Sequence, residues 1–162
     1  MKCRFWHQEL LRYKPTLIFL MLWTQKTLRL KPFSNGIHSI TQDVIEAIPE
    51  IREIESGLLN IFLQHTSASI TINENADPDV QTDLGMVLHN IVPESLPYDH
   101  TLEGDDDMPA HVKSSMLGVS LNIPISKGKL ALGTWQGIYL CEHRRSVHHR
   151  TIILTVFGKK IK

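Results

Sequence analysis

The feature that most constrains the fold is the stretch of residues 58–75, where the pattern of apolar residues changes partway along. Residues 58–63 form an almost continuous apolar run, Leu-Leu-Asn-Ile-Phe-Leu, which is typical of a strand buried on both faces. From His65 onward polar and apolar residues alternate, so one face of a strand would carry the polar side chains. We therefore predict one central strand that starts in the core and ends near Asn75.

The polar face of this predicted strand carries short hydrogen-bonding side chains, where a solvated face usually carries long charged ones. They are His65, Ser67, Ser69, Thr71 and Asn73. The stretch that follows, residues 73–79, is dense in carboxylates and amides. Two interpretations stay open: a solvated face of an antiparallel sheet, where Ser and Thr are ordinary residues, or the wall of a pocket.

The remaining pattern predicts an α+β fold, mainly of antiparallel sheets with interspersed helices. Helices are expected from Thr41 to about Ile51, with Pro49 ending or tightening the first, from Pro78 to Ile91, and over residues 105–118. Further strands are expected over residues 23–30, 119–125, 130–143 and 151–157, with a hairpin turn at residues 127–129.

Length and composition indicate one globular domain. The chain has 162 residues, 42% of them hydrophobic, and a net charge of zero, which provides no basic field for nucleic acid. The apolar segment 16–23 is shorter than the ~20 residues that a membrane span needs. We predict that residues 1–20 are an extension, with Met21 as an alternative start, and that residues 21–162 form the domain. Two cysteines, Cys3 and Cys141, offer no disulfide framework and favour a cytoplasmic protein.

Two further segments combine polar side chains with the signals of an element end. Asp107, His111 and Ser115 are four residues apart, so they share one face of the third predicted helix. A carboxylate beside an imidazole fixes its tautomer, which suits a general base or a metal ligand. The alternative is that the aspartates stabilise the helix start and His111 is a surface residue.

The third segment is residues 132–143, where Gly133 and Gly137 indicate the close approach of a ligand or of another backbone segment. His65, His111 and His143, one from each segment, could supply the three protein ligands of a zinc site that keeps an open position. We interpret Cys141 as a packing residue. We interpret His148 and His149, in the loop 144–150, as a solvated basic edge, although the arginines Arg144, Arg145 and Arg150 of this loop could bind an anion.

These segments resemble the three sequence blocks of the YjbQ-like family, also labelled secondary thiamine-phosphate synthase. The blocks are Gln64–Ser69 with Asn73–Asp79, Asp106–Ser115, and Leu132–His143. The resemblance implies a compact α+β fold, a homotrimer and a polar pocket with a divalent metal, zinc or magnesium. It also implies a weak ability to join a pyrimidine diphosphate to a thiazole phosphate.

Carried over position by position, the resemblance suggests a set of site residues. Catalytic roles fall to His65, Glu74, Asp107, His111 and Glu142, substrate binding to Ser67, Ser69, Asn73, Lys113, Thr134 and Gln136, and metal binding to His65, His111 and His143. Three functions follow as hypotheses: the thiamine-phosphate-synthase-like transferase, a metal-dependent hydrolase or lyase on a small phosphorylated metabolite, and a non-catalytic metabolite-binding trimer. No nucleic-acid or membrane partner is expected.

Overall fold

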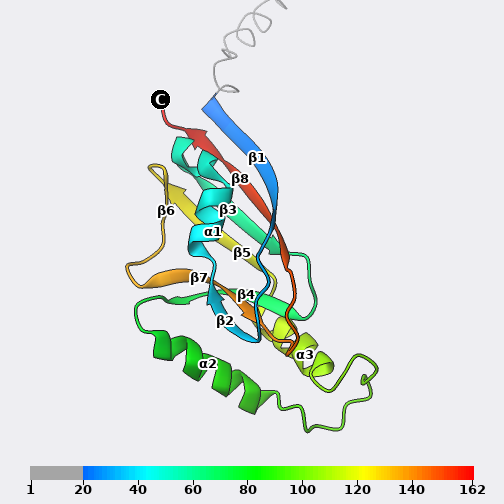
Figure 1. Cartoon of the computed structure of the whole chain (residues 1–162). Helices are drawn as coiled ribbons and strands as arrows, with labels where there is room; N and C mark the ends of the chain where they lie inside the picture. Colours follow the sequence, from blue (N-terminus) through cyan, green and yellow to red (C-terminus); the bar gives the residue numbers. More distant parts are fainter. Residues whose placement is uncertain (1–19) are drawn as a thin grey trace, which may run out of the picture.

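The computed structural model describes residues 20–162, and its strands form two antiparallel sheets (Figure 1). The larger sheet has the order β1 (Met21–Arg29), β8 (Thr151–Lys160), β3 (Ile54–Leu63), β5 (Ser120–Ser126) and β6 (Lys129–Leu130). The smaller sheet has the order β2 (Gly36–Ser39), β7 (Gln136–Glu142) and β4 (Ala68–Glu74). The predicted α+β class is therefore confirmed, whereas the predicted extension lies, apart from residue 20, outside the described residues.

The helices are α1 (Thr41–Ala47), the 3-10 helix η3 (Pro49–Glu53), α2 (Pro78–Ile91) and α3 (Asp107–Leu117). Their ends follow local signals: Asp77 accepts a hydrogen bond from the Asp79 amide at the start of α2, and Gly118 takes φ 91° just after α3. Pro49 ends α1 early and begins η3, so the first predicted helix is split in two. Within residues 20–162, no helix has the length and apolar character to cross a membrane.

One hydrophobic core joins the two sheets. The larger sheet contributes Leu59, Ile61, Ile123 and Leu154, the smaller sheet Ile70 and Leu140, and α1 Val44. Helix α3 packs against β4 and α2 against β2, so both lie at the end of the molecule that holds the smaller sheet (Figure 1). Cys141 is fully buried there, and burial raises the pKa of its thiol to about 11, which agrees with its interpretation as a packing residue.

The prediction of one central strand over residues 58–75 is wrong. β3 ends at Leu63, residues 64–67 leave the larger sheet, and β4 begins at Ala68 in the smaller one. Residues 68–70 are all buried, so the alternation there does not mark one polar face. The predicted strand 130–143 is split in the same way, because β6 ends at Leu130 and β7 begins only at Gln136.

The pairing of β3 with β8 depends on two glycines that face each other, Gly57 and Gly158. A Cβ atom on Gly57 would lie 2.3 Å from the Phe157 carbonyl oxygen and 2.8 Å from Gly158 Cα, both of them backbone atoms. We expect Gly57→Ala to lower the free energy of unfolding by about 2 kcal/mol or more, measured by urea denaturation.

The matched control is Gly85→Ala in α2, where an added Cβ meets nothing within 4 Å. An alanine inside a helix should raise the free energy of unfolding by about 0.5–1 kcal/mol. Equal effects of the two substitutions would contradict the steric argument.

Candidate functional site

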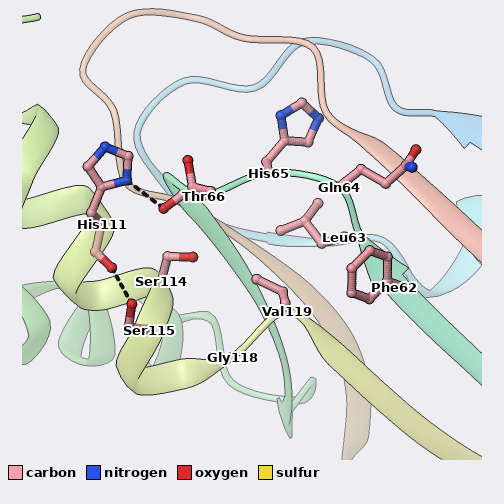
Figure 2. Close-up of a pocket in the computed structure, with 10 residues that line it drawn as sticks. All are labelled: Phe62, Leu63, Gln64, His65, Thr66, His111, Ser114, Ser115, Gly118 and Val119. Carbon is pink, nitrogen blue, oxygen red and sulfur yellow. Dashed lines mark hydrogen bonds between the residues drawn. The ribbon is translucent and has the colours of Figure 1, made fainter.

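A cleft of about 640 Å³ opens where the chain passes from β3 to β4, beside α3 and the start of β5 (Figure 2). It is lined by Phe62, Leu63, Gln64, His65, Thr66, His111, Ser114, Ser115, Gly118 and Val119. Two of the three histidines singled out in the sequence, His65 and His111, therefore lie on the wall of one cleft.

The pairing of His111 with Asp107 on one face of α3 is confirmed. His111 Nδ1 donates to the Thr66 carbonyl oxygen over 2.9 Å, and His111 Nε2 lies 3.3 Å from Asp107 Oδ2 (Figure 2 shows the first contact). Because a carbonyl oxygen only accepts, we assign the proton of the neutral ring to Nδ1. Nε2 and Oδ2 are then two acceptors face to face, an arrangement that requires a proton or a metal cation between them.

His100 completes this group from the loop before α3. Its Nε2 lies 2.9 Å from the same Asp107 Oδ2, and the ligand atoms of His100, Asp107 and His111 lie within 4.8 Å of one another. No other cluster of three such ligands exists among residues 20–162. The Asp107 side chain is only 2% exposed, and Arg144 binds its other oxygen. Two imidazoles and one carboxylate fit zinc better than magnesium, which prefers oxygen ligands.

Of the predicted metal set of His65, His111 and His143, only His111 belongs to this group. His65 Nε2 accepts a hydrogen bond of 2.8 Å from the Thr151 amide, and His143 Nε2 is hydrogen-bonded to Ser69 Oγ over 2.8 Å. Sequence spacing could not show that these two rings are held by other parts of the chain.

His65 has a defined protonation state. Burial, followed by the positive charge of Arg150, lowers the pKa of its imidazole. Because Nε2 accepts from Thr151, the neutral ring carries its proton on Nδ1. His65 is therefore a hydrogen-bond donor on the wall of the cleft.

Glu142, predicted as a catalytic base, is the partner of a buried arginine. Arg150 Nε and Nη2 donate to its two oxygens over 2.7 and 2.6 Å, and the two residues are 3% and 1% exposed. Arg150 Nη2 also reaches Ser67 Oγ at 3.2 Å, which gives Ser67 a structural contact. With both oxygens held, Glu142 ties the last residue of β7 to the residue that precedes β8, and it does not line the cleft.

The other arginines of the loop 144–150 are also paired with carboxylates. Arg144 binds Asp106 and Asp107, and Arg145 binds Glu94. Burial raises the pKa of Asp106, but hydrogen bonds from the Arg145 amide and the Arg144 side chain outweigh it, so the net pKa is lowered. Each arginine of this loop that could have bound an anion therefore has a carboxylate partner in the chain itself.

The far end of the smaller sheet holds three predicted residues, Asn73, Glu74 and Gln136, and the turn just before β7 holds a fourth, Thr134. Glu74 pairs with Gln136, whereas Ala68 pairs with Glu142 six residues away along the same ladder, roughly 20 Å. Gln136 accepts from the Gly133 amide and Asn73 from the Glu74 amide, so both stabilise local backbone. At Gly137 the close neighbour is a side chain and not a backbone segment, since an added Cβ would lie 2.9 Å from Asn75 Cβ.

The two remaining predicted residues, Ser69 in β4 and Lys113 in α3, are buried and do not line the cleft. The sequence reasoning missed His100, Arg144 and Arg150. A histidine seven residues before Asp107 was the one available signal for His100, and it is weak because the path of the intervening loop sets the distance. No local sequence pattern predicts the pairing of Arg150 with Glu142.

Comparison with known proteins shows to which family the chain is similar. The family model described as UPF0047 protein YjbQ-like matches residues 26–159. The UPF0047 protein YjbQ of Escherichia coli O157:H7 is 47% identical over 138 residues, 85% of this chain and 100% of that protein. YugU of Bacillus subtilis is 43% identical over 118 residues, 72% of this chain and 87% of that protein.

Solved structures show the same fold. A YbjQ-like protein of unknown function from Sulfolobus solfataricus P2 has a TM-score of 0.75 at 25% identity, covering 86% of this chain and 99% of that one. A YjbQ/UPF0047 family protein from Clostridium acetobutylicum has a TM-score of 0.70 at 38% identity, covering 82% and 98%. These relatives carry no named activity, so function has to be argued from the side chains. The chain belongs to the UPF0047 YjbQ-like family.

Proposed function

We propose that the protein is a metal-dependent enzyme, a hydrolase or lyase, that acts on a small phosphorylated metabolite in the cleft of Figure 2. The observation that carries the proposal is that His111 belongs to both the cleft and the group of candidate metal-binding side chains. Its ring lines the cleft and also belongs to the group of His100 and Asp107. A cation held there would lie beside the space open to a substrate.

The surrounding contacts support this group as a metal site. In metal-binding histidines the ring nitrogen that does not bind the metal usually donates a hydrogen bond to an oxygen, as His111 Nδ1 does to the Thr66 carbonyl. Arg144 binds the other oxygen of Asp107, Oδ1, and so orients the carboxylate. A divalent cation would supply Lewis-acid polarisation of a substrate oxygen. His65 would donate from Nδ1 to a phosphoryl oxygen at the other side of the cleft.

Joining a pyrimidine diphosphate to a thiazole phosphate, as the resemblance implies, would use the same cleft and cation. It has less support from the side chains, because Arg144, Arg145 and Arg150 are already paired with carboxylates. A diphosphate leaving group requires free cationic partners. On the resemblance alone, we extend the proposal to a homotrimer in the cytoplasm, and light scattering on the purified protein tests the trimer.

The test is elemental analysis of untagged wild-type protein and of His111→Ala. We expect about one zinc ion per wild-type chain and its loss in His111→Ala, because a three-ligand site loses one of its donors. His148→Ala is the matched control, since it removes an imidazole outside the group and should keep the metal.

Activity is then measured as the consumption of candidate phosphorylated metabolites by the wild type, with Asp107→Asn as the comparison. We expect turnover to be lost with the metal. Untagged wild type that contains no bound metal as purified, or an equal metal content in His111→Ala, would refute the metal site. Metal binding without turnover of any candidate would favour the non-catalytic binding protein, and formation of thiamine phosphate would favour the transferase.

A further inference from the structure

A second cavity, of about 210 Å³, lies on the other side of α3 from the cleft. Its polar lining includes Asn35, His89, Glu94, Lys113, Glu142 and His143, and it shares no lining residue with the cleft. Lys113 follows His111 by two positions, which on an α-helix turns a side chain by roughly 200°. Helix α3 therefore contributes side chains to both the cleft and the second cavity.

Lys113 is the unusual residue of this cavity. It is only 7% exposed, and its ammonium has no hydrogen-bond or ion-pair partner among residues 20–162. Within those residues, every side-chain nitrogen or oxygen sealed from solvent has a partner. The ammonium must therefore keep contact with open space, and the cavity that Lys113 lines provides it.

The other charged groups around the cavity are already compensated. Glu142 is held at both oxygens by Arg150, and Glu94 is paired with Arg145. Asp106, the carboxylate whose charge acts on Lys113, accepts from Arg144 Nε at 3.0 Å and from the Arg145 amide at 2.8 Å. Among residues 20–162, the largely buried Lys113 ammonium is thus the charged group of this cavity that lacks an ion-pair partner, and burying an unpaired charge is costly.

We propose that this cavity binds a small tetrahedral oxyanion, either free phosphate or the phosphate group of a metabolite, through the Lys113 ammonium. A volume of about 210 Å³ holds a phosphate group and a few further atoms but no large ligand. Asn35, His89 and Arg145 lie on the same wall and provide additional polar groups for the oxyanion. This site goes beyond the proposed function, because it is separate from the cleft and from the group of His100, Asp107 and His111.

The experiment is isothermal titration of inorganic phosphate into the whole protein, as purified and after removal of metal. We expect one saturable site per chain in both samples. Lys113→Met should weaken binding about ten- to a hundredfold, the usual loss for a hydrogen bond to a charged group. Lys129→Met is the matched control, because it removes a surface lysine outside the cavity and should bind phosphate as the wild type does.

Further controls separate loss of the anion site from loss of the fold and identify the source of the anion. Lys113→Met should fold normally, since replacing an unpaired buried charge by an apolar side chain is not expected to destabilise. Gly85→Leu leaves Lys113 intact and places an apolar side chain at the cavity wall, where an added Cβ meets nothing within 4 Å, so it should also weaken binding. Phenyl phosphate distinguishes the sources: competition with inorganic phosphate indicates a metabolite phosphate, and its exclusion indicates free phosphate.

No saturable binding up to about 10 mM phosphate, the range of very weak ligands, would overturn the proposal. Wild-type affinity in both Lys113→Met and Gly85→Leu would overturn it as well. Phosphate bound only by the metal-containing sample would assign the anion to the cleft and refute this second site. Because binding to metal-free protein is measured directly, failure of the metal site would not remove this result.

Discussion

Arg150→Met is expected to lower the free energy of unfolding by about 3–5 kcal/mol, a large share of the roughly 5–15 kcal/mol that stabilises a typical domain. The guanidinium donates to both oxygens of Glu142, and neither residue has appreciable solvent access. Removing the arginine leaves a buried carboxylate that still accepts a hydrogen bond of 3.0 Å from the Arg144 amide. Urea denaturation followed by circular dichroism measures the loss.

Two further variants separate this cause from a general loss of packing. Arg150→Met combined with Glu142→Leu should recover most of the stability, because no charge is then left buried. Lys26→Met is the control, since its ion pair with Glu50 is partly exposed and should contribute about 1 kcal/mol or less. If Arg150→Met costs no more than Lys26→Met, the buried pair does not stabilise the protein as argued.

The helices were predictable from the sequence because their signals are local. Asp77 and Pro78 start α2, and Gly118 follows the last residue of α3, each within one turn of the end that it marks. The break between β3 and β4 has no such signal, because residues 64–67 contain neither glycine nor proline. It is set by contacts with distant residues, among them the hydrogen bond from the Thr151 amide to His65.

In the candidate site too, only the contacts between residues close in the sequence could be predicted. Asp107 and His111 could be paired in advance because four residues on a helix fix their distance. His143 could not be placed by strand alternation, because residues 137–142 of β7 are all buried and neither face is marked by polar side chains. The role of Glu142 was missed for a similar reason, since its partner Arg150 follows a loop whose path the sequence pattern does not reveal.

Acid should destabilise the protein through His143, with a loss of about 3 kcal/mol between roughly pH 6.5 and pH 4. Burial, followed by the charges of Lys113 and Arg150, lowers the pKa of the His143 imidazole to about 4. Between the two values the unfolded chain binds a proton that the folded protein does not, so stability falls as the pH falls. The free energy of unfolding of metal-free protein, measured against pH in chloride buffer, checks this.

His143→Gln isolates the contribution of this ring, because an amide can keep the hydrogen bond to Ser69 Oγ and does not titrate. We expect the variant to lose much less stability between pH 6.5 and pH 4. Some acid sensitivity should remain, since burial also lowers the pKa of His65. A slope as steep as that of the wild type would place the titrating group elsewhere. Phosphate bound beside His143 would favour the charged form of the imidazole. Added phosphate should therefore make the free energy of unfolding of the wild type depend less steeply on pH. The pH dependence of Lys113→Met should not change when phosphate is added.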